Sequence, residues 1–68
     1  MNKNQKTMIV HRFEKEDIKQ MIGFHSNASD SDIFKAVRQM QEDLKKNDMI
    51  VENPAEIYLW IKEFRDKT

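Results

Sequence analysis

The sequence predicts a mainly helical α+β domain in the order β-α-α-β-α, with three helices packed on a short two-stranded sheet. Three segments carry apolar residues at the three- and four-residue spacing of an amphipathic helix. Two short runs, at 7–13 and 49–51, are rich in β-branched and other apolar residues, as strands are. The single Gly and the single Pro both fall at predicted helix ends, so no linker divides the chain.

The totals limit the kind of protein this can be. Sixty-eight residues suffice for one small domain, predicted at 7–68 after a disordered tail at 1–6. With no cysteine, disulfides and thiolate metal sites are excluded. Twelve basic residues balance twelve acidic ones, so no net field attracts nucleic acid or anionic lipid. No apolar run reaches membrane-spanning length and the N-terminus lacks the apolar core of a secretion signal, which predicts a cytoplasmic protein. The excess of Lys over Arg favours a bacterial or phage source.

The first strand and helix are expected at 7–13 and 14–22. In the helix, Ile18, Met21 and Ile22 share one face, and acidic residues occupy the first turn, where the helix dipole favours them. Gly23 is expected to end this helix in the left-handed conformation.

The second helix is expected to begin after Ser29, a typical capping residue, and to end near Lys46. Asn47 and Asp48 predict a turn before the strand at 49–51, which should pair with 7–13. Because two strands alone are marginal in water, they must lie on the helices or gain a third strand from another chain. The mostly apolar residues that follow a helical period here are Ile33, Phe34, Val37, Met40, Gln41 and Leu44.

The last helix, at 53–65, has the clearest start signal and two apolar faces. Asn53 is expected to cap it, with Pro54 at the first helical position and Glu56 completing a capping box. Leu59 points nearly opposite to the stripe that should enter the core. We therefore expect one face to bind another protein or a second copy of the chain. The expected protein-binding residues are Tyr58, Leu59, Trp60 and Arg65.

Catalysis and metal binding are not expected. His11 and His25 are the only histidines, and they have no ligand-like spacing. The chain has no nucleophile elbow and no glycine-rich phosphate loop, and it is too short to build a water-excluding cleft. The sequence therefore predicts a protein that is not an enzyme and has no cofactor.

Two neighbouring segments within 14–51 offer a second interpretation. Residues 18–24, Ile-Lys-Gln-Met-Ile-Gly-Phe, resemble the first helix and turn of a helix-turn-helix DNA-binding domain. Residues 33–40 resemble its second helix, and residues 47–51 are similar to the strand that begins a wing. The resemblance covers 14–51 and implies that Gly23 is the turn glycine and that Ile18, Ile33 and Val37 are core residues. It also implies that Ser31, Lys35 and Arg38 face the major groove or phosphates.

The leading hypothesis is a small non-catalytic regulatory or adaptor protein that acts by protein contact through its C-terminal helix, as a heteromer or a homodimer. The alternative is a small helix-turn-helix-like DNA-binding regulator that uses the helix at 29–46. Its expected DNA-binding residues are Ser31, Lys35, Arg38, Lys45 and Lys46.

Overall fold

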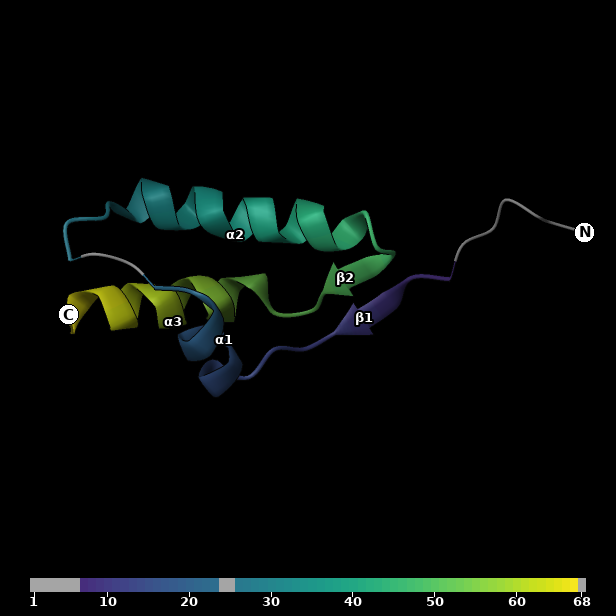
Figure 1. The fold of residues 1–68 in the computed structure, drawn as a ribbon, viewed down its shortest axis with the longest axis horizontal. Helices are drawn as coiled ribbons and strands as arrows, with labels where there is room; N and C mark the ends of the chain where they lie inside the picture. The colour runs from purple at the N-terminus through teal and green to yellow at the C-terminus, as the bar shows by residue number, and fades with distance from the viewer. Residues whose placement is uncertain (1–6, 24–25, 68) are drawn as a thin grey trace, which may run out of the picture.

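The computed structural model describes residues 7–23 and 26–67, and it has the predicted β-α-α-β-α order (Figure 1). The predicted tail at 1–6 lies outside the described residues. The first strand is shorter than the predicted 7–13, whereas the second has the predicted bounds. No helix in the described part of the chain is both long and apolar enough to cross a bilayer. The elements are β1 (Ile9–His11), α1 (Lys15–Met21), α2 (Asp30–Lys45), β2 (Met49–Val51) and α3 (Pro54–Asp66).

The sheet consists of β1 and β2, paired in parallel at one end of the molecule (Figure 1). Val10 is paired with Ile50, and His11 with Val51. Val51 is buried on the side of the helices, so Val10 and Ile50 face the other way, because paired residues share a face of the sheet. In a sheet of two strands each strand has one unpaired edge, and α2 contacts β2.

The helices pack chiefly on one another around α3, which contacts α2 and α1. This arrangement buries Ile57 and Ile61 of α3 against Ile18 of α1 and Ile33 of α2. Each of these four isoleucines is at most 1% exposed. Burying one such side chain contributes about 1.5–3 kcal/mol, so these contacts are the main stabilisation of the fold.

The helix-end signals had mixed outcomes. Ser29 caps α2 as predicted, because its Oγ accepts a hydrogen bond from the Asp32 N–H at 3.0 Å. The prediction for Gly23 was wrong: it does not have a positive φ, and α1 ends instead at Ile22 in extended conformation. The turn at 46–48 is present, and Asp48 has a φ of 60° there. Asp is among the residues that tolerate this left-handed conformation.

The predicted cap of α3 was also wrong. Asn53 makes no side-chain cap hydrogen bond to the helix. Its side chain points instead toward the backbone of Phe13, where Oδ1 accepts from the N–H at 3.0 Å and Nδ2 donates to the C=O at 2.9 Å. Asn53 is only 6% exposed, so this amide joins the segment after β1 to the start of α3 inside the protein.

Candidate protein-binding groove

An apolar groove of about 510 Å³ runs between α2 and α3. The two helices are antiparallel, since Asp30 at the start of α2 pairs with Arg65 near the end of α3. The groove follows the middle of α2 and the first half of α3. Its walls are almost entirely apolar, and its lining residues are Phe34, Val37, Arg38, Gln41, Pro54, Ala55, Tyr58 and Leu59.

Two large apolar side chains at this groove are exposed to solvent. Phe34 is 53% exposed and Leu59 is 59% exposed. A nearby residue on each helix points inward: Ile33, directly before Phe34, is fully buried, and so is Ile57, two positions before Leu59. Phe34 lies about 100° around the helix from Ile33, at the margin of the buried stripe that includes Ile33 and Val37. The exposure of both side chains is therefore set by the helical rotation.

Among the described lining residues, Arg38 is the one that carries a charge. Its guanidinium lies 5.8 Å from the centre of the Phe34 ring, within the range of a cation–π contact. Gln41, one turn further along α2, adds an amide to the same wall. The groove thus has an apolar floor with a cation on one side.

The residues expected to bind protein are only partly brought together. Tyr58 and Leu59 line the groove, and Tyr58 also packs against the core. Trp60 does not line it and instead packs against the core as a half-buried side chain. Arg65 lies at the other end of α3. The groove therefore contains two of the four expected residues.

Arg65 is engaged inside the chain. Its side chain is 12% exposed and forms an ion pair with Asp30, while Nη1 also donates to the Ala28 carbonyl at 3.1 Å. The hydrogen bond from Arg65, together with the nearby Lys62, lowers the pKa of the Asp30 carboxyl below its usual value. This contact ties the start of α2 to the end of α3 and so holds the two walls of the groove together at one end.

The residues expected to bind DNA lie on the exposed side of α2, and each of the five is exposed. By helical rotation they share one face, but Glu42 lies near the centre of that face. Asp30 and Asp32 add negative charge at the start of the helix. The face therefore has mixed charge. Arg38 belongs both to this face and to the groove.

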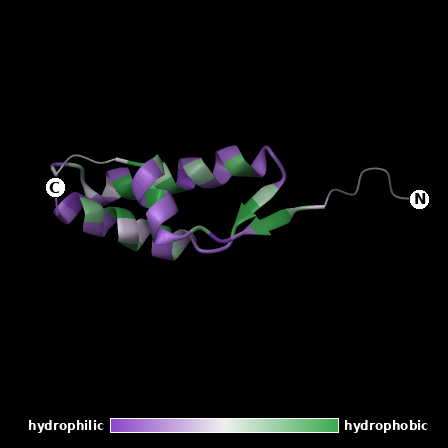
Figure 2. Ribbon diagram, turned by 60° about the horizontal axis from the view of Figure 1, so that its bottom comes forward, coloured by the Kyte–Doolittle hydropathy of each residue, from purple (hydrophilic) through white to green (hydrophobic). Residues whose placement is uncertain are grey.

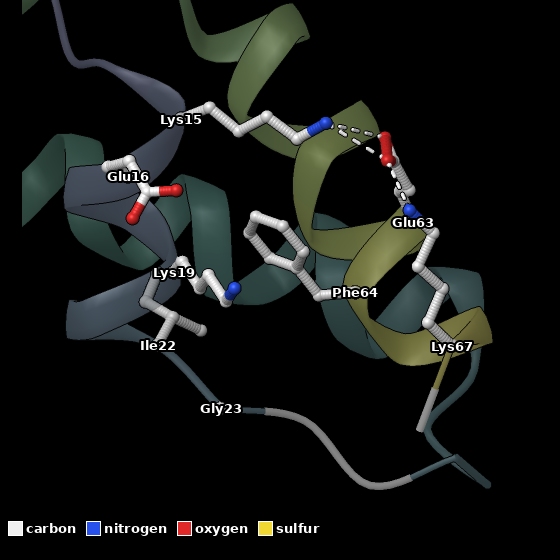
Figure 3. Close-up of a pocket in the computed structure, with 8 residues that line it drawn as sticks. All are labelled: Lys15, Glu16, Lys19, Ile22, Gly23, Glu63, Phe64 and Lys67. Atoms are coloured by element: carbon white, nitrogen blue, oxygen red, sulfur yellow. Dashed lines mark hydrogen bonds and ion pairs between the residues drawn. The ribbon is translucent and has the colours of Figure 1, made fainter.

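A second hollow, of about 540 Å³, lies between α1 and the end of α3 (Figure 3). Lys15 and Lys67 point at Glu63 from opposite sides, with Nζ–Oε2 distances of 2.9 and 3.1 Å. Lys15 also lies 6.0 Å from the centre of the Phe64 ring. Both lysines form ion pairs with the Glu63 carboxylate of the same chain. We therefore interpret the Lys15–Glu63 pair as a contact that holds α1 against α3, and not as part of a binding site.

No other chemistry-bearing cluster was found in the described part of the chain. There, no three side chains of His, Asp or Glu come together as a metal site would require. His11 is exposed, and its ring is nearly perpendicular to that of Phe13, with the ring centroids 4.5 Å apart. The predicted loop residue His25 lies outside the described residues.

Comparison with models of known protein families, with curated proteins and with solved structures finds no match to this chain.

The contribution of α2 to the groove was missed from the sequence. The sequence places Phe34 in the helical period of its helix and predicts Arg38 as a candidate contact to DNA. A signal was present, because Phe34 lies about 100° around the helix from Ile33, at the margin of the apolar stripe. What the sequence could not supply was the position of α3 beside Phe34.

Proposed function

We propose that this chain is a small non-catalytic regulatory or adaptor module that acts by binding an amphipathic helix of another protein in the groove between α2 and α3. The observation that carries the proposal is the pair Phe34 and Leu59, more than half exposed on either side of an apolar groove. Large apolar patches on small proteins commonly mark interaction sites.

The shape and chemistry of the groove support a helix as the occupant. Two antiparallel helices with an apolar furrow between them accept a third helix, whose anchors would recur at positions i, i+3 or i+4, and i+7. Tyr58 at the furrow and Arg38 at its side belong to the residue types enriched in binding hot spots. Arg38 favours a partner that carries a carboxylate beside its apolar stripe.

Site-specific photocrosslinking tests this proposal. A photo-reactive amino acid at position 55 replaces the exposed, groove-lining Ala55 and leaves Phe34 and Leu59 in place. The control position is Gln39, which is exposed on α2 but rotated by roughly 150° from the groove-lining residues. In cells that naturally produce the chain, we expect a protein adduct from position 55, none from position 39, and loss of the adduct when Leu59→Asp is added.

Equal adduct yields at positions 55 and 39, or an adduct that survives Leu59→Asp, would contradict the proposal. The DNA-binding alternative predicts a different outcome. In that case the chain would bind duplex DNA in a salt-dependent manner, Lys35→Glu and Arg38→Glu would weaken the binding, and Leu59→Asp would not affect it.

A further inference from the structure

The outer edge of β1 presents backbone groups that no described segment of the chain satisfies. On the inner edge, the Ile9 N–H donates to the Asp48 C=O at 2.9 Å, and the His11 C=O accepts from the Glu52 N–H at 2.8 Å. Successive residues of a strand direct their backbone groups to opposite edges. The N–H and C=O of Val10 therefore point away from β2, toward the edge that has no neighbour in Figure 1.

The side chains at this edge are apolar and exposed. Val10 is 59% exposed and its partner across the sheet, Ile50, is 43% exposed, and the two share the face turned away from the helices. Ile9, on the other face, is 58% exposed. In Figure 2 the two strands form a largely hydrophobic end of the molecule. A two-stranded sheet with such an edge is marginal in water and is a template for another strand.

We propose that this edge is a self-association surface, on which β1 of a second copy pairs antiparallel with β1 about a two-fold axis at Val10. The inference concerns a surface away from the groove and does not depend on the proposed function. The result would be a four-stranded mixed sheet in the order β2, β1, β1 of the second copy, β2 of the second copy.

The second copy is favoured because the edge is complementary to itself. A two-fold axis at Val10 lets the two Val10 residues exchange both of their N–H···O=C bonds, as a hydrogen-bonded antiparallel pair does. Ile9 then lies opposite His11 of the second copy, and Met8 opposite Arg12 of the second copy, so no like charges oppose each other. On the outer face, the two valines and the two Ile50 side chains would form one continuous apolar row.

The contact is short, so the association should be weak. β1 has three residues, and an interface of this length buries much less than the roughly 800 Å² per partner of a stable complex. We therefore expect a dimer that forms at high protein concentration and dissociates on dilution.

Disulfide trapping tests the arrangement, because the chain contains no cysteine. In the proposed pairing the two Val10 Cα atoms lie about 5.5 Å apart, within the range that a disulfide spans. Val10→Cys should give a covalent dimer under mild oxidation. Ile50→Cys is exposed on the same face, but its two copies would lie about 14 Å apart, three strand spacings, and should remain monomeric. Equal trapping of the two variants, or trapping of neither, would overturn the proposal.

Sedimentation equilibrium provides a second, independent readout. Val10→Pro removes an N–H that the β1–β2 pairing does not use, so the variant should keep its circular dichroism spectrum and lose self-association. Leu59→Asp should leave self-association unchanged. A chain that stays monomeric at all concentrations would overturn the proposal, as would a dimer that is lost with Leu59→Asp and kept with Val10→Pro, which would place the second copy in the groove.

Discussion

The side-chain amide of Asn53 forms two hydrogen bonds with the backbone of Phe13, forty residues earlier in the chain. The amide oxygen accepts from the Phe13 N–H and the amide nitrogen donates to the Phe13 C=O. These two bonds continue the hydrogen bonding between the strands past the end of β2. Nδ2 also donates to Glu56 Oε1 at 3.2 Å. One buried polar side chain thus connects the segment after β1 to the start of α3.

This relationship predicts a large loss of stability in Asn53→Ala. The substitution leaves the buried N–H and C=O of Phe13 without partners, at a cost of about 2–4 kcal/mol in the free energy of unfolding. Urea denaturation followed by circular dichroism measures the loss. Asn27→Ala, at an exposed turn position, is the control and should change stability by less than about 0.5 kcal/mol. A similar, small effect of both substitutions would show that the Phe13 contact contributes little.

The left-handed backbone of Asp48 predicts a difference between two substitutions that both remove its carboxylate. Asp48 has a φ of 60°, which is strained for a residue with a Cβ. Glycine in Asp48→Gly has no Cβ and adopts this angle without strain, whereas alanine in Asp48→Ala does not. The Ala variant should therefore be less stable than the Gly variant by about 1 kcal/mol, as measured by thermal or urea unfolding. Equal stabilities would mean that the turn changes conformation when Asp48 is replaced.

The contacts of Asp30 predict a loss of stability in acid. The hydrogen bond from Arg65 lowers the pKa of Asp30 in the folded state below its ordinary value of 3.8. A lowered folded-state pKa contributes stability that is fully present above the unfolded-state pKa and is lost as the pH falls through the folded-state pKa. The pKa of Glu63 is lowered in the same direction, chiefly by its hydrogen bond to Lys15. Stability should therefore decrease below about pH 4.

Urea titrations at pH values between 6 and 2.5 measure this decrease. Asp30→Asn should flatten the dependence on pH, because the group that gains a proton is gone. Asp43→Asn is a suitable control, since the exposed Asp43 carboxylate accepts a hydrogen bond from the neutral side-chain amide of Gln39. An Asp30→Asn profile as steep as that of the unaltered chain would mean that other carboxylates govern the acid transition.

The apolar residues exposed at the groove should contribute little to the free energy of unfolding. Leu59→Ser removes a side chain that is 59% exposed and should change the free energy of unfolding by less than about 0.5 kcal/mol. Ile57→Ala, on the buried side of the same helix, should cost about 2–5 kcal/mol. Thermal unfolding of the two variants measures the contrast. A large loss in Leu59→Ser would indicate that Leu59 is part of the core of the chain.

Much of the fold was predictable because it follows from local signals. Helical spacing located all three helices, and Ser29 gave the start of α2. The error at Asn53 has its origin in a contact between distant residues. Asn53 has the local pattern of a cap, but Phe13 offers its side chain two hydrogen bonds inside the core. The parallel direction of the strands likewise depends on how α1 and α2 return the chain, which no short segment specifies.

The candidate site was less predictable. The rotation of α3 correctly indicated that Leu59 points away from the stripe that enters the core, and it is exposed. The sequence did not indicate that Phe34 and Arg38 of α2 form the facing wall, because their distance from α3 is set by tertiary packing. It also did not indicate that Arg65 is held by Asp30, thirty-five residues away.

The most direct measurement is the affinity of the chain for the protein captured at position 55, determined by calorimetry with purified components. Leu59→Asp should weaken binding by at least about 30-fold, the loss typical of a hot-spot residue. Met21→Asp, a matched change at a side chain that is 58% exposed on α1, should leave the affinity unchanged. Equal affinities for the unaltered chain and Leu59→Asp would contradict the proposal that the groove between α2 and α3 is the binding site.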